Sequence, residues 1–191
     1  MNPNMLRALL LGLIASAILV ISPPHASADN KKCADDGKVI KDFQPQEKPA
    51  PAPSAPFFTA EGAERTFADY RGAGLVVNFW ATWCAPCVRE MPSLDRLQSK
   101  VKGDAILVLV ISEDRDGAEA VRKFYAKANI ANLPILLDNR SKLMRRAEIN
   151  GLPATLLIDP QGNLAGRVVG TVEWDSPEVV AFIRRCLGAV D

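Results

Sequence analysis

Cys84 and Cys87 are the side chains of this 191-residue chain whose type and spacing are best suited to chemistry. Two thiols separated by two residues can close a small disulfide ring and reopen it without moving the rest of the protein. An apolar run of strand length, residues 75–80, precedes them, and residues 88–101 can form a helix. A CxxC pair at the point where a buried strand turns into a helix is typical of a redox-active site.

The two thiols are expected to have different roles. The N-terminus of a helix carries unpaired N–H groups and a positive partial charge, which favour a thiolate. Pro86 suits the first turn, where its missing N–H would have had no partner. We expect Cys84 to be the exposed nucleophile that forms a mixed disulfide with a partner, and Cys87 to resolve it. A structural disulfide or a two-thiolate metal clamp is the alternative. A metal site usually needs more ligands, so no metal and no cofactor is expected.

The residues between the cysteines indicate the direction of electron transfer. Ala85 and Pro86 bring no cation to the Cys84 thiolate, and Arg89 is expected to be solvated. A less stabilised thiolate makes a less stable reduced form, so the pair is predicted to donate electrons. Two alternatives stay open. One is an oxidant or isomerase on the same fold, and the other is a non-enzymatic Cu(I)-binding module that uses both thiolates. Met91 would be a soft ligand in that module and is otherwise a core residue.

Glu90 and Asn78 are the polar residues most closely associated with the pair. Glu90 comes three residues after Cys87, so both side chains share a helix face. Its carboxylate could take the proton of the Cys87 thiol as that thiol attacks the mixed disulfide. The alternative is a first-turn glutamate favoured by the helix dipole. Asn78 interrupts a hydrophobic strand and is expected to be buried, hydrogen-bonded and structural. A neutral amide cannot accept a proton, which leaves Glu90 as the better base.

Residues 1–28 are expected to be a signal peptide. Arg7 precedes an uncharged run of 14 residues, 8–21, and Ala26-Ser27-Ala28 fits a cleavage site. The run is shorter than the about 20 residues that a membrane-spanning helix needs, which favours a cleaved signal. An uncleaved anchor is the alternative.

His25 is the only histidine and leaves with the signal, which excludes a Cys–His nucleophile pair or a histidine zinc site. Of the 23 Lys and Arg residues, only Arg7 leaves with the signal, so 22 basic residues remain against 22 acidic ones. The chain therefore lacks the excess of positive charge that is typical of nucleic-acid-binding proteins.

The remaining chain is predicted to be a tether followed by one domain. Residues 29–56 are predicted to be a proline-rich tether, because 44–56 contains five prolines and favours extended conformations. Residues 57–191 have the composition of one globular domain. The periodicity predicts an α/β fold with a mixed sheet and helices on both faces. The predicted elements are a hairpin over 57–67, strands over 74–81, 104–112, 135–137, 155–158 and 164–169, and helices over 117–128, 141–147 and 176–187.

Three stretches carry a resemblance to a known family: residues 76–87, Glu90-Met91-Pro92 and residues 151–159. Over about residues 57–187 the chain resembles the thioredoxin superfamily, in its periplasmic TlpA/ResA/CcmG-like branch. Residues 170–174, Gly-Thr-Val-Glu-Trp, are most similar to the TlpA members. The resemblance implies a thioredoxin fold, a central mixed sheet flanked by helices, with an N-terminal hairpin and a central insertion.

The resemblance also implies roles for individual residues. It implies a cis Leu152–Pro153 bond that faces the disulfide, with the Leu152 backbone pairing to the client strand. Trp83, Pro86, Leu152 and Pro153 are accordingly expected to contact the client. It strengthens the association of Glu90 with the cysteines.

Members of the branch are dedicated periplasmic reductants, and the resemblance implies the same here. The expected clients are disulfide-containing proteins of cytochrome c maturation or of copper-centre assembly in cytochrome oxidase. The expected electron donor is a CcdA/DsbD-type membrane protein. Ala154 stands where CcmG-type members usually carry glutamate, which weakens that assignment. The periplasm is the expected location, with anchoring to the inner membrane by the N-terminal segment as the alternative.

Cys33 and Cys186 are spare cysteines near opposite ends of the chain. Cys186 shares a helix face with Val179, Phe182 and Ile183, so a buried free thiol is one interpretation. In an oxidising compartment the two could instead form a disulfide that clamps the tether to the final helix. Both interpretations stay open.

Overall fold

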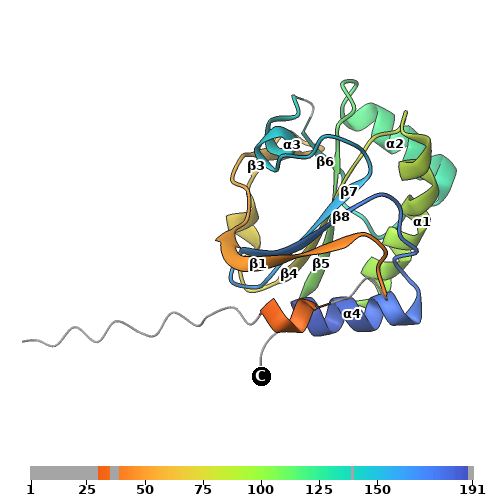
Figure 1. Cartoon of the computed structure of the whole chain (residues 1–191). Coiled ribbons are helices and arrows are strands. Elements are labelled where there is room, and N and C mark those ends of the chain that lie inside the picture. Colours follow the sequence, from red (N-terminus) through yellow and green to blue (C-terminus); the bar gives the residue numbers. More distant parts are fainter. Residues whose placement is uncertain (1–29, 35–38, 139, 189–191) are drawn as a thin grey trace, which may run out of the picture.

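A single eight-stranded sheet organises the computed structural model, which describes residues 30–34, 39–138 and 140–188 (Figure 1). The strand order is β1-β8-β7-β4-β5-β6-β2-β3. The strands are β1 (Phe43–Pro51), β2 (Phe57–Thr59), β3 (Glu64–Arg65), β4 (Gly74–Trp80), β5 (Ile106–Ser112), β6 (Leu136–Leu137), β7 (Ala154–Ile158) and β8 (Asn163–Val169). The helices are α1 (Ala85–Lys100), α2 (Ala118–Ala128), α3 (Lys142–Arg146) and α4 (Pro177–Leu187), with the 3₁₀ helices η1 (Asn30–Cys33) and η2 (Phe67–Tyr70).

The centre of the sheet places the two active-site cysteines. β4 runs parallel to β5 on one side and antiparallel to β7 on the other. A parallel pair needs a crossover connection, and α1 provides it between β4 and β5. All seven residues of β4 are buried, Asn78 included, as expected for a strand whose two faces are both covered. Because β4 leads directly into α1, the CxxC lies at the carboxyl ends of β4 and β5 and beside the start of the antiparallel β7.

The side chains of β4 alternate between two cores. Val76 and Trp80 face the larger core, to which α1, α2 and α4 contribute. Val77 and Phe79 face a second core, which includes side chains of η2 and α3. The predicted mixed sheet with helices on both faces is therefore confirmed. The hairpin β2–β3 precedes β4, and β6 and α3 lie between α2 and β7 as the expected central insertion.

The prediction of a tether over residues 29–56 is wrong. Residues 43–51 form β1, an edge strand that pairs antiparallel with β8, with an irregular register between Pro45 and Ala50. An edge strand tolerates proline because its outer N–H groups need no partner, and its backbone dihedrals resemble those of polyproline. Phe43 is buried against Phe182 of α4, with ring centroids 5.2 Å apart. The folded domain therefore begins well before residue 57.

A disulfide joins the start of this domain to its end. Cys33 of η1 is bonded to Cys186 of α4, 153 residues later in the chain. The bridge predicted as one of two interpretations is present. It clamps η1, rather than a free tether, to the last helix (Figure 1).

The described helices include none that is both long enough and apolar enough to cross a membrane. The predicted signal peptide of residues 1–28 lies outside the described residues.

Candidate active site

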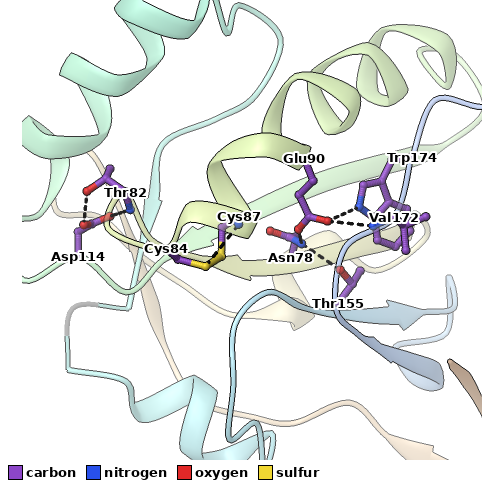
Figure 2. Close-up of a disulfide and its surroundings, with 9 residues drawn as sticks. All are labelled: Asn78, Thr82, Cys84, Cys87, Glu90, Asp114, Thr155, Val172 and Trp174. Carbon is purple, nitrogen blue, oxygen red and sulfur yellow. Dashed lines mark hydrogen bonds between the residues drawn. A yellow bond between two sulfur atoms is a disulfide. The ribbon is translucent and has the colours of Figure 1, made fainter. Parts of the chain in front are cut away.

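Cys84 and Cys87 form a disulfide at the first turn of α1 (Figure 2). Cys84 is the N-cap residue, so α1 begins at Ala85, three residues earlier than predicted. The Cys87 N–H points at the Cys84 sulfur, 3.4 Å away, and Pro86 lies in the first turn as expected. Cys84 is only 6% exposed, so the expectation of an exposed thiol is wrong, but Cys84 lines a surface pocket whereas Cys87 is fully buried. Cys84 is therefore the cysteine that a client can approach from the pocket, and the roles of attacking and resolving thiol stay a prediction.

Asp114 holds the loop that leads into the cysteines. This buried carboxylate follows β5 and accepts hydrogen bonds from the Thr82 N–H at 2.9 Å and the Thr82 hydroxyl at 2.6 Å (Figure 2). It also accepts a hydrogen bond from the Ser112 hydroxyl at 2.7 Å. Thr82 lies two residues before Cys84, so Asp114 ties the nucleophile's loop to the neighbouring strand. Sequence reasoning missed this residue; its only local signal is an acidic residue directly after a buried strand.

Glu90 is buried on α1, one turn after Cys87, among three hydrogen-bond donors. Its Oε1 accepts from the Asn78 side chain at 2.9 Å. Its Oε2 accepts from the Val172 N–H at 3.2 Å and from the Trp174 indole N–H at 3.3 Å (Figure 2). Asn78 also donates to the Thr155 hydroxyl at 3.0 Å, which confirms its buried structural role. The contacts of Asn78 connect β4 to α1 and to β7.

Burial raises the pKa of Glu90 to about 7, although its hydrogen bonds to Asn78, Val172 and Trp174 oppose the rise. Loss of solvation disfavours the charged form, and the donors compensate only in part. Both protonation states are therefore populated near neutral pH. A carboxyl group with such a pKa can accept a proton from a thiol and later release it.

The Leu152–Pro153 peptide bond is cis, as the resemblance implies. The Pro153 carbonyl accepts from the Gly170 N–H at 3.0 Å, which ties the loop to the segment after β8. Trp83, Pro86 and Leu152 line one pocket of about 970 Å³ together with Cys84. Trp83 is 69% exposed, so its ring is free to contact a client. Pro153 is buried and is not part of the lining.

No group of three or more His, Cys, Asp or Glu side chains among the described residues could hold a metal ion. Met91, considered above as a soft copper ligand or else a core residue, is fully buried in the larger core.

Comparison with known proteins agrees with this geometry. Residues 46–167 match the model of the AhpC/TSA family. A thiol-disulfide oxidoreductase ResA of Geobacillus kaustophilus (strain HTA426) is 32% identical over 121 residues, which are 63% of this chain and 68% of the relative. A ResA of Bacillus cereus is 30% identical over 131 residues, 67% of this chain and 75% of the relative.

Solved structures show the same fold. A crystal structure of a thiol:disulfide interchange protein of the DsbE type from Chlorobium tepidum has a TM-score of 0.62 and 25% identity, covering 72% of this chain and 98% of that one. A thioredoxin family thiol:disulfide interchange protein from Chlorobium tepidum TLS has a TM-score of 0.59 and 26% identity, covering 72% and 99%. The assignment to TlpA within the branch stays a prediction. The chain belongs to the AhpC/TSA family, and within this thioredoxin-like family it is a thiol-disulfide oxidoreductase that works by dithiol–disulfide exchange.

Proposed function

We propose that the protein is a reductase of disulfide bonds in client polypeptides. The observation that carries the proposal is the acidic surrounding of Cys84. The pocket that Cys84 lines is also lined by Glu113, Asp114 and Asp116, and Arg115 is the only cation in that lining. Neighbouring carboxylates disfavour a thiolate, and a less stable thiolate makes the dithiol a better electron donor.

The proposed reaction has two exchange steps. The Cys84 thiolate attacks a client disulfide, forms a mixed disulfide and releases one client thiolate. Cys87 then gives its proton to Glu90, attacks the Cys84 sulfur and closes the Cys84–Cys87 disulfide. The second client thiolate leaves and takes up a proton. The client gains two electrons and the protein loses them, so a separate donor must reduce the disulfide again.

The cellular setting is part of the proposal. The resemblance to periplasmic reductants and the predicted signal peptide support action in the periplasm. The clients would be proteins of cytochrome c maturation or of copper-centre assembly in cytochrome oxidase, and the donor a CcdA/DsbD-type membrane protein. An exported, processed protein should begin near Asp29, which mass spectrometry of the N-terminus can test. A retained N-terminal segment in the membrane fraction would support the anchored alternative.

The reduction potential tests the direction. Equilibration with a thiol–disulfide buffer, followed by tryptophan fluorescence, should give a potential below about −200 mV. A value near the about −120 mV of strong oxidants would contradict the reductase assignment. The variant Pro86→His provides a calibration, because an imidazolium beside Cys84 should stabilise the thiolate and raise the potential.

Trapping tests the client class. In Cys87→Ser the mixed disulfide on Cys84 cannot be resolved, so clients should remain attached and can be identified. Cys84→Ser/Cys87→Ser is the matched control and should capture nothing. Captured cytochrome or copper-assembly proteins would support the pathway. A Cys87→Ser protein that captures no polypeptide in the periplasm would count against polypeptide clients.

A further inference from the structure

The pocket beside Cys84 has an apolar part and an acidic part. Trp83, Pro86, Met144 and Leu152 contribute apolar surface. The segment directly after β5 contributes Glu113, Asp114, Arg115 and Asp116. The same pocket of about 970 Å³ contains Cys84, so a side chain close to an attacked client cysteine can reach both parts.

Glu113 is the unusual member of this lining. It is 7% exposed, and neither of its carboxylate oxygens has a hydrogen-bond partner among the described residues. The Ser141 hydroxyl lies beside it and acts against the rise in its pKa, but without the geometry of a hydrogen bond to either oxygen. Its main-chain N–H is satisfied by the Trp80 carbonyl at 2.9 Å, so the backbone position is well defined.

The charges around Glu113 do not supply its missing partner. Asp114 and Asp138 add negative charge, and Arg145 is the cation that partly offsets them. Burial is the largest influence and raises the pKa of Glu113 to about 7. A buried carboxylate without a partner is unfavourable, typically by about 1–3 kcal/mol or more. A donor that enters from the pocket would remove this penalty.

The other two acids of the lining differ in availability. The oxygens of Asp114 are occupied by Thr82 and Ser112. Asp116 is exposed and forms no ion pair within 4 Å with another described residue, and its charge acts on the nearby Lys123 ammonium of α2. Asp116 is therefore available to a ligand at the surface. The Glu113 oxygens have no hydrogen-bond partner in the described part of the chain to give up but are almost inaccessible, so a ligand meets them once the side chain turns toward the pocket. Arg115, also exposed, is the one lining cation that opposes a positively charged ligand.

We propose that this pocket is a subsite for a lysine or arginine side chain next to the client cysteine. The aliphatic stem would lie against Met144 and Leu152, and the cationic head would meet Asp116 and Glu113. Long cationic side chains bury their stems on apolar surface in this way while the charge is paired. The exposed Trp83 ring can add a cation–π contact. The inference rests on the proposed function, because it takes the client to be a polypeptide.

A thiol-exchange equilibrium measures the subsite without requiring turnover. The Cys87→Ser protein is converted to its Cys84–glutathione mixed disulfide and mixed with a short peptide that carries one cysteine. The peptide thiolate displaces glutathione, one disulfide is exchanged for another, and no net oxidation occurs. Peptides with lysine, norleucine or glutamate beside the cysteine are compared. The lysine peptide should be favoured over norleucine by about tenfold, and glutamate disfavoured.

Acid variants in the Cys87→Ser background locate the effect. Glu113→Gln should reduce the lysine preference to about threefold or less, and Asp116→Asn should reduce it in part. The exchange equilibrium constant of the norleucine peptide should stay unchanged in both variants. Glu47→Gln, which removes one exposed carboxylate from β1 at the far edge of the sheet, is the matched control and should keep the full preference.

Equal constants for the three peptides would overturn the subsite. A lysine preference that survives both Glu113→Gln and Asp116→Asn would also overturn the subsite. So would a lysine preference that falls equally in Glu47→Gln, because the preference would then reflect the overall charge of the protein. Failure of the wild-type protein to reduce a disulfide peptide would instead contradict the proposed function. The exchange equilibrium would still report on the subsite in that case.

Discussion

Glu90 illustrates how much the surroundings of one residue determine its chemistry. A glutamate on an exposed helix surface would stay ionised at neutral pH. Here burial raises the pKa of Glu90 to about 7, while Asn78, Val172 and Trp174 hold the carboxyl group in one orientation. The group is thus fixed in position and poised between its two protonation states.

Replacing Glu90 should remove a pH-dependent step from the resolution of the mixed disulfide. As a base Glu90 acts only when deprotonated, so the wild-type rate should rise as pH increases through about 7. Glu90→Gln should lose this rise and resolve about 100-fold more slowly at pH 7. The measurement starts from the Cys84–glutathione mixed disulfide formed at low pH and follows glutathione release after a pH jump.

The exposed Glu119 of α2 offers a control for that experiment. Glu119→Gln should keep the wild-type profile. A Glu90→Gln protein with the same rise near pH 7 would show that another group accepts the Cys87 proton.

At the scale of elements, the loop between β4 and α1 depends on Asp114. Asp114→Asn keeps the shape of the side chain but removes its charge and one acceptor oxygen. Either the Thr82 N–H and the Ser112 hydroxyl, which share Oδ2, or the Thr82 hydroxyl on Oδ1 then loses its acceptor. We expect a loss of about 2–4 kcal/mol in the free energy of unfolding, measured by urea titration. Asp116→Asn changes an exposed residue of the β5–α2 segment that carries Asp114 and should stay within about 0.5 kcal/mol. An unaffected Asp114→Asn would mean that the loop is held by other contacts.

A second loop, residues 170–176, is fastened to α1 and carries two of the donors to Glu90. The Arg96 guanidinium donates to the two carboxylate oxygens of Asp175 at 2.7 and 3.2 Å. The hydrogen bond from Arg96 is the main cause that lowers the pKa of Asp175 to about 2. The Arg96–Asp175 ion pair therefore helps to hold Val172 and Trp174 in place against α1.

Arg96→Gln should therefore destabilise the protein in a pH-dependent way. The folded pKa of Asp175 lies below its usual 3.8, so the stabilisation is present above about pH 4 and is lost as pH falls toward 2. We expect a loss of about 1 kcal/mol at pH 7, limited by the exposure of Arg96 and by salt, and a smaller difference at pH 3. Urea titrations at both pH values test this. Lys123→Gln breaks a fully exposed pair with Glu119 and should leave the urea midpoint unchanged. An Arg96→Gln effect equal at both pH values would argue against the ion pair.

At the scale of the whole molecule, the Cys33–Cys186 disulfide closes nearly the entire domain into a loop. Cross-links that close long loops restrict the unfolded chain most, and 153 residues separate these two. Cys33→Ser/Cys186→Ser should lower the free energy of unfolding by about 2–5 kcal/mol. The reduction potential of the Cys84–Cys87 pair should not change. Denaturation and redox titration measure the two quantities.

The active-site pair is the natural comparison. Cys84 and Cys87 are three residues apart, so Cys84→Ser/Cys87→Ser should lose far less stability. Equal losses in the two double variants would contradict the loop-length argument.

Much of the fold could be read from local patterns. The apolar run of β4, the CxxC at its end and the capped start of α4 at Ser176-Pro177 all depend on near neighbours in the chain. Their predicted positions agree with the structure to within a few residues. The sequence alone does not separate β1 from a tether, because a proline-rich edge strand and a polyproline segment have almost the same backbone conformation. Its pairing with β8 is what distinguishes them.

Residue types and short spacings predict the two thiols, their order of attack and the position of Glu90 one turn further along α1. They can do so because helix ends and helix faces are local properties. The partners of those groups come from distant parts of the chain. Asp114 reaches Thr82 across 32 residues, and Trp174 reaches Glu90 across 84. Such contacts exist only once β5 and the loop after β8 lie against α1. Tertiary packing sets burial and long-range proximity. It therefore decided the raised pKa of Glu90, the lack of a hydrogen-bond partner for Glu113 among the described residues and the disulfide between Cys33 and Cys186.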